Sequence, residues 1–265
     1  MARRAMTGGE HAAPRSRGAR RAEPGAEAPQ ASMPGRIDSW LDLAKLAAAC
    51  ADGSWIFRGE SVPLDDGHVL REPMRPAAGR VGQEKRAARK LPHDTHHEEL
   101  ALAEFVRQAR PHLGHEPHTP LEWLAIAQHH GMSTRLLDWT ESILVAAFFA
   151  TREIEDRGGL IYGVKDLPEV TKDDERNPFA VRRVGIYRPP HITPRIPAQR
   201  SVVTLHPDPT EAFHPPELHE WPIAGPACGE IKRVLDVCGI NESSLFPGLD
   251  GLSRHIGWRY KWGRI

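Results

Sequence analysis

Residues 128–140 carry an unusual density of side chains that are able to bind a ligand or take part in catalysis. The segment reads Gln128-His-His-Gly-Met-Ser-Thr-Arg-Leu-Leu-Asp-Trp-Thr140 and lies between two stretches with helical apolar spacing. Polar groups at such a junction need hydrogen-bond partners or a ligand. Arg135 and Asp138, three residues apart, are able to pair, and Thr140 is able to cap the next helix. The residues left without a structural explanation are Gln128, His129, Ser133 and Thr134.

Arg58 is a second candidate for chemistry. It follows a short apolar run, Trp55–Phe57, that predicts a buried strand, and it precedes Gly59. The planar guanidinium group suits a carboxylate or a phosphate, and the glycine permits a ligand or another backbone to approach closely. The alternative is a structural arginine that pairs with a carboxylate of the core.

The secondary-structure elements expected to position these residues are mainly helices in the first half of the chain and mainly strands in the second half. Helical spacing dominates the first half, and short apolar runs dominate the second half. This order predicts an α+β fold rather than alternating strands and helices, in a single domain whose N-terminal helices pack on a small mixed or antiparallel sheet. We expect helices at 38–50, 98–113, 120–130, 142–156, 230–238 and 249–260, strands at 55–57, 160–164, 184–187, 202–206 and around Trp221, and a long loop at 60–97.

Residues 1–35 differ in composition from the rest of the chain. They consist mainly of Ala, Arg, Gly, Pro and Glu, and residues 1–36 hold seven arginines against three glutamates. Large apolar side chains are scarce there, so the segment is expected to be disordered and to precede one domain at 36–265. Met33 stands immediately before the globular sequence, which raises the hypothesis that translation starts there.

The remaining composition narrows the class of protein. No run approaches the roughly 18 apolar residues of a membrane span, and no secretory signal is recognisable, so we expect a cytoplasmic protein without a membrane partner. The 35 basic and 35 acidic residues give no basic excess that would favour tight nucleic-acid binding. The three cysteines predict free, mostly buried thiols in a reducing compartment.

No metal site is expected. His93, His96 and His97 precede Glu98 and Glu99, but they fall in the predicted loop and lack the spacing that places two ligands on one helix face. A solvated run at the start of a helix, with the glutamates favoured by the helix dipole, explains them better.

The strings that contain Arg58 and residues 128–140 resemble the signature of the FRG-domain family, which is named for the Phe-Arg-Gly at Phe57–Gly59. The resemblance spans about residues 38–257. The apolar Ala146-Ala-Phe-Phe-Ala150 that follows residues 128–140 belongs to the same signature. Weaker similarity to that family is found in Arg195-Ile-Pro-Ala-Gln199 and Ser244-Leu-Phe-Pro-Gly-Leu-Asp-Gly-Leu252. The chain departs from the family pattern at Glu60, where Gln is usual, and at Ser201 and Val203, where Gly and Phe are expected.

A more distant resemblance, to mono-ADP-ribosyltransferases of the Arg–Ser–Glu class, implies a fold and a mechanism. In that class an arginine of the first strand contacts the phosphates and ribose of NAD, a Ser-Thr element orients the nicotinamide side, and a glutamate of a late strand stabilises the oxocarbenium-like transition state. The resemblance makes Arg58 the phosphate anchor and Ser133-Thr134 the nicotinamide-side element. His129 or His130 would then bond a ribose hydroxyl.

The same resemblance leaves the catalytic carboxylate without a matching residue. Gln199 occupies the late segment and cannot ionise, and nearby alternatives are Glu211, Glu217 and Glu220. The implied catalytic residues are Arg58, Ser133 and Gln199. The implied NAD-binding residues are Arg58, Gly59, His129, His130, Ser133, Thr134 and Arg135.

The resemblance therefore implies an enzyme that transfers ADP-ribose from NAD to an unknown macromolecular acceptor, or that cleaves NAD, as in a toxin or a defence effector. Two alternatives stay open. The missing carboxylate is compatible with a module that binds a nucleotide or another anion without chemistry. The proline-rich loops are compatible with a protein-interaction domain.

Overall fold

The computed structural model describes residues 33–62, 64–65, 68–69, 73–84, 93–114, 116–153 and 158–263. The helices are α1 (Trp40–Ala49), α2 (Ala77–Glu84), α3 (Thr95–Ala109), η1 (Arg110–His112, a 3-10 turn), α4 (Pro120–His129), α5 (Ile143–Ala150), α6 (Lys172–Arg176), α7 (Arg195–Gln199), α8 (Gly225–Val237), α9 (Glu242–Leu245) and α10 (Leu249–Lys261). The strands are β1 (Trp55–Glu60), β2 (Leu64–Asp65), β3 (His68–Val69), β4 (Leu136–Thr140), β5 (Gly159–Lys165), β6 (Gly185–Tyr187), β7 (Ser201–Leu205) and β8 (His219–Ile223). Within these ranges, no helix combines the length and the apolar character that a membrane crossing requires.

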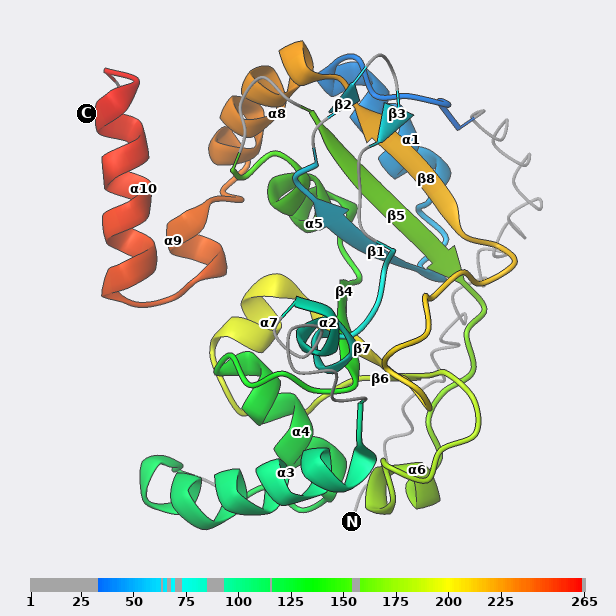
Figure 1. The fold of residues 1–265 in the computed structure, drawn as a ribbon. Coiled ribbons are helices and arrows are strands. Elements are labelled where there is room, and N and C mark those ends of the chain that lie inside the picture. The colour runs from blue at the N-terminus through cyan, green and yellow to red at the C-terminus, as the bar shows by residue number, and fades with distance from the viewer. Residues whose placement is uncertain are drawn as a thin grey trace, which may run out of the picture. The chain divides into compact units, whose positions relative to one another are not determined.

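Six of the strands form one sheet in the order β6-β7-β4-β1-β5-β8 (Figure 1). Every neighbouring pair in this order is antiparallel. The predicted combination of helices with a small sheet is therefore confirmed, and the sheet is antiparallel rather than mixed. β2 and β3 form a separate hairpin.

One half of the sheet carries α5, with α1 and α8 in the same apolar core. α5 consists of Ile143-Leu-Val-Ala-Ala-Phe-Phe-Ala150, and its apolar side chains are mostly buried. Its backbone lies directly on β1, because a Cβ atom at Gly59 would be 1.8 Å from the carbonyl oxygen of Ala146. Gly59 therefore admits another backbone, which is one of the two roles expected for it.

The other half of the sheet packs against α3 and α4, whose buried residues share a core with Leu136, Val203 and Leu205. Arg135 joins these layers. Its side chain is completely buried and forms an ion pair with Glu98 of α3 at 2.8 Å. The expected pairing of Arg135 with Asp138 is therefore wrong, because consecutive residues of a strand point to opposite faces and residues three apart do not meet.

The cap of α5 also differs from the expectation. Ser142 is the N-cap, and its hydroxyl accepts a hydrogen bond from the amide of Val145. The Thr140 hydroxyl instead donates to the carbonyl of Gln199 at 2.7 Å and accepts from the amide of Ser142. Thr140 therefore ties β4 to the end of α7.

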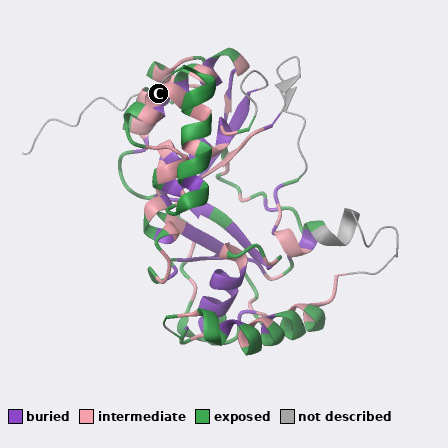
Figure 2. Ribbon diagram, turned by 90° about the vertical axis from the view of Figure 1, so that its left-hand side faces the viewer, coloured by how far each residue is buried: buried purple, intermediate pink, exposed green. Residues whose placement is uncertain are grey.

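Several other expectations were tested by the described residues. The predicted loop at 60–97 contains β2, β3, α2 and the start of α3, which begins at Thr95. The disorder expected for 1–35 falls outside the described residues except at 33–35. All three cysteines carry free thiols, and two of them are buried. Figure 2 shows α10 exposed along much of its length, in contrast to the buried strands.

Candidate functional site

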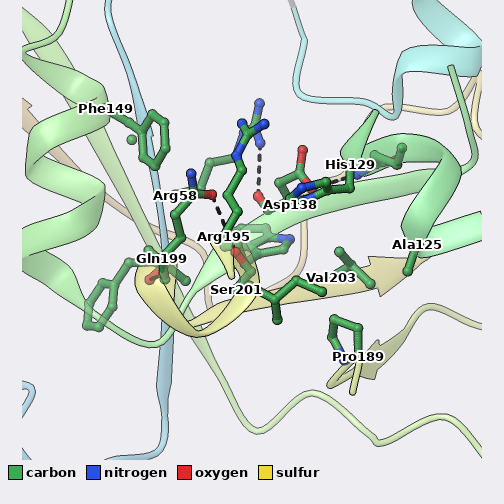
Figure 3. A pocket seen from close by; sticks show the side chains of 16 residues that line it. Arg58, Ala125, His129, Asp138, Phe149, Pro189, Arg195, Gln199, Ser201 and Val203 are labelled. Carbon is green, nitrogen blue, oxygen red and sulfur yellow. Dashed lines mark hydrogen bonds between the residues drawn. The ribbon is translucent and has the colours of Figure 1, made fainter. Parts of the chain in front are cut away.

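A cavity of about 270 Å³ lies on the sheet between α4, α5 and α7. Its floor is formed by β1, β4 and β7, where the register places Phe57 opposite Thr140 and Asp138 opposite Val203. In Figure 3, Phe149 lies on one side of the cavity and Ala125 lies on the opposite side. The volume is close to the roughly 300 Å³ at which small-molecule pockets begin.

Arg58 lies where β1 and β4 separate in the floor of the cavity. β1 and β4 pair at a single register position, Phe57 with Thr140. Beyond that point the Arg58 side chain bridges the two strands, because its Nη1 donates to the carbonyl oxygen of Asp138 at 2.9 Å. Its Nε donates to Glu60 at the same distance, 2.9 Å. Glu60 and the Asp138 carbonyl thus hold the guanidinium group in place, and no described residue accepts a hydrogen bond from Nη2.

Arg195, the first residue of α7, brings a second guanidinium group to the cavity. Its guanidinium carbon lies 4.6 Å from the centre of the Phe246 ring. Among the residues that the structure describes, none forms a hydrogen bond or an ion pair with this side chain. Burial lowers the pKa of Arg195, the nearby carboxylate of Asp138 opposes this shift, and Arg152 adds to it, yet an arginine remains charged.

The sequence-based interpretation did not include Arg195 among the site residues. The available signal was the segment Arg195-Ile-Pro-Ala-Gln199, which resembled the family without an assigned role. The structure places both ends of this segment on the cavity.

Asp138 contributes the carboxylate of the cavity. Its side chain is exposed and accepts a hydrogen bond from Nε2 of Gln128 at 2.6 Å. The amide oxygen of Gln128 accepts in turn from the hydroxyl of Thr134, which is buried. Thr134 thus lies away from the cavity lining and orients Gln128, which orients the carboxylate of Asp138.

His129 lies at the end of α4 on the cavity wall. Burial lowers its pKa to about 4, and the positive charge of Arg195 and then His130 act in the same direction. The imidazole is therefore neutral at pH 7, and it is able to donate one hydrogen bond and accept another. Its neighbour His130 is exposed and does not line the cavity.

Gln199 lines the cavity and is buried. Its Nε2 donates to the carbonyl of Leu245 at 2.9 Å, so part of its hydrogen-bonding capacity serves the fold. Ser201, the first residue of β7, is also on the lining.

The structure does not bring all the predicted site residues together. Arg58, Gly59, His129 and Gln199 share the cavity, whereas His130, Ser133, Thr134 and Arg135 are absent from its lining. Ser133 is exposed, and Arg135 is enclosed by the α3 contact. The alternative carboxylates Glu211, Glu217 and Glu220 do not line the cavity either. Asp138, which the sequence-based interpretation assigned to structure, does.

Comparison with known proteins gives one match. Residues 53–158 match the family model of the FRG domain. The matched segment begins just before β1 and ends just after α5, so it includes Arg58, His129 and Asp138 but neither Arg195 nor Gln199. No curated protein and no solved structure matches the chain. The resemblance to the FRG domain noted from the Phe-Arg-Gly and Gln-His-His-Gly strings is therefore confirmed over residues 53–158.

Proposed function

We propose that the cavity binds a nucleotide of the NAD type, with its phosphates on Arg58 and Arg195. The observation that carries the proposal is the convergence of two guanidinium groups on one cavity, where Arg195 has no carboxylate partner among the described residues. The Arg195 guanidinium group and Nη2 of Arg58, which donate to no described residue, favour an anion, and the planar fork of a guanidinium group matches phosphate oxygens.

The rest of the lining fits the other parts of such a ligand. Phe149 offers aromatic surface for a base, and the neutral imidazole of His129 is suited to a ribose hydroxyl. The arrangement also supports the more distant resemblance in outline. The first-strand arginine, the strand that follows Ser133-Thr134, and a late strand are neighbours, as β1, β4 and β7.

The test is isothermal calorimetry of the full chain with NAD, ADP-ribose and adenosine. We expect NAD and ADP-ribose to bind. The variant Arg195→Gln should weaken their binding by about 10- to 100-fold, because a hydrogen bond to a charged group contributes roughly 1.5–3 kcal/mol. Adenosine, which has no phosphate, should lose less affinity.

Arg188→Gln is the matched control for this substitution. Arg188 is an exposed arginine that pairs with Glu141 at 2.9 Å and is not on the cavity lining. Its replacement should leave the affinity for NAD unchanged within about twofold, because exposed ion pairs contribute little. If none of the three ligands binds, or if both variants weaken binding equally, the assignment of this cavity to a nucleotide is wrong.

Asp138 favours a second candidate function, the cleavage of NAD or the transfer of its ADP-ribosyl group. In this reaction the bond between the ribose C1′ and nicotinamide breaks, and nicotinamide leaves with the bonding electrons. Water or an acceptor hydroxyl then adds to the positively charged C1′ and releases a proton. A carboxylate held in place stabilises that positive charge, and Asp138 is the carboxylate of this cavity.

Asp138→Asn tests the catalytic candidate, because it removes the charge and keeps the oxygen that accepts from Gln128. We expect the rate of nicotinamide release to fall by about 100-fold while the affinity for NAD stays nearly constant. Glu141→Gln, which removes a carboxylate just after β4 and outside the cavity, should retain the rate. If the wild-type protein binds NAD but releases no nicotinamide and labels no acceptor in cell extract, the catalytic proposal is wrong and the binding proposal remains.

A further inference from the structure

A second cavity adjoins the first. Its volume is about 460 Å³, and it shares Arg58, Gly59 and Phe149 with the first cavity. Arg58 and Phe149 therefore stand on the boundary between the two spaces. The rest of its lining comes from residues 60–62, from the segment 73–75 before α2, from Arg80 of α2 and from the residues just after α5.

Positive charge dominates this second cavity. Its lining contains four arginines and two glutamates: Arg58, Arg75, Arg80, Arg152, Glu60 and Glu153. Glu60 is already paired with Arg58 at 2.9 Å. The charge of Arg152 is balanced from outside the cavity by Glu242, at 2.6 Å. Of these four arginines, Arg75 has no acidic partner among the described residues.

Arg75 supplies the most specific observation. Its Nε is buried, and no atom of the described residues accepts a hydrogen bond from it. Arg75 likewise forms no ion pair with a described residue. A buried and unsatisfied donor on a charged group is costly, and it requires an explanation. An anion in the second cavity would satisfy both the donor and the charge.

From this geometry we infer that the second cavity is a binding subsite for a phosphate-type oxoanion, with Arg75 as its main ligand. The subsite is separate from the nucleotide site proposed above and does not depend on it. Two sources share the required chemistry. One is a free oxoanion, and the other is a phosphoryl group of a ligand whose remainder lies in the first cavity, past Arg58.

Inorganic pyrophosphate is the probe, used with the full chain in thermal unfolding and in calorimetry. Pyrophosphate should raise the unfolding temperature of the wild type, because a ligand that binds the folded state stabilises it. Arg75→Gln should lower the affinity for pyrophosphate by about tenfold or more. Arg195→Gln, which changes the first cavity alone, should leave that affinity unchanged within about twofold.

A further readout separates binding from folding. Because no described residue accepts a hydrogen bond from Nε of Arg75, Arg75→Gln should not lower the unfolding temperature without pyrophosphate. If Arg75→Gln does not fold, Arg75→Lys keeps the charge, loses the Nε donor, and should show an intermediate affinity. Loss of stability in the empty Arg75→Gln protein would mean that Arg75 serves the fold, and this would overturn the inference.

The remaining outcomes are equally decisive. No binding of pyrophosphate by the wild type overturns the subsite, as does an equal loss of affinity in Arg75→Gln and Arg195→Gln. Competition between pyrophosphate and ADP supports the subsite and identifies a phosphoryl group of the nucleotide as the source. Simultaneous binding of pyrophosphate and ADP supports the subsite and identifies a free oxoanion as its ligand. If adenosine, NAD and ADP-ribose fail to bind while pyrophosphate binds through Arg75, the proposed function fails and the subsite stands.

Discussion

Replacing Gly59 with alanine is expected to lower the free energy of unfolding by about 3 kcal/mol, the upper part of the range for overpacked cores. The added Cβ would lie 1.8 Å from the carbonyl oxygen of Ala146 and 2.8 Å from the amide nitrogen of Ala150. Both are backbone atoms of α5, so no side chain is able to rotate away. The helix itself would have to move from β1. Urea denaturation followed by circular dichroism measures the effect.

Gly257→Ala is the control for the same chemical change. Gly257 lies in α10, and a Cβ there meets no atom within 4 Å. Alanine is favoured over glycine inside a helix by roughly 0.5–1 kcal/mol, so this variant should be as stable as the wild type or slightly more so. A Gly59→Ala protein with the stability of the wild type would show that α5 does not rest on β1 in this way. The glycine of the Phe-Arg-Gly string would then need another explanation.

Replacing Arg135 with methionine is expected to lower the free energy of unfolding by about 3–5 kcal/mol, as removal of one partner from a buried ion pair does. The guanidinium group donates to Glu98 at 2.8 Å, to the carbonyl of Pro207 at 3.2 Å and to the hydroxyl of Thr95 at 3.3 Å. Methionine fills much of the space but leaves Glu98 with His93 as its partner. The comparison of urea midpoints between variant and wild type gives the change.

The double variant Arg135→Met with Glu98→Leu should recover part of this loss, because an apolar pair often replaces a buried ion pair at little cost. Arg107→Met is the exposed control. Arg107 pairs with Glu104 one turn away on the surface of α3, and its replacement should have no measurable effect. If Arg135→Met unfolds at the same urea concentration as the wild type, the layer of α3 does not depend on this ion pair.

The elements that the sequence predicted well are those with a local signal. Ser39 caps α1 and Pro120 opens α4, as capping rules lead one to expect. β5 to β8 were predicted because each is a short apolar run bounded by turn residues. β4 was missed. Its residues, Leu136-Leu-Asp-Trp-Thr140, are buried on both faces except at Asp138, so they show no clean alternation.

The missing strand explains the errors around it. Once Leu136–Thr140 is a strand, Arg135 cannot meet Asp138 on one face, and Thr140 is too early to cap α5. The site was only partly predictable for a related reason. Arg58, His129 and Gln199 were identified through family motifs. Arg195 lies in the same motif as Gln199 but received no role, because its place on the cavity depends on contacts between segments far apart in the chain. No local pattern reports such contacts.

The order of the strands also indicates which segment of the chain is needed for the sheet to fold as one cooperative unit. The family match ends at residue 158, before β5 and β7 begin. Those two strands pair with the outer edges of β1 and β4. A fragment limited to 53–158 would therefore present two strands with unpaired backbone donors and acceptors, an arrangement that promotes aggregation. The segment that matches the family model is therefore shorter than the segment from β1 to β8 that contains all six strands of the sheet.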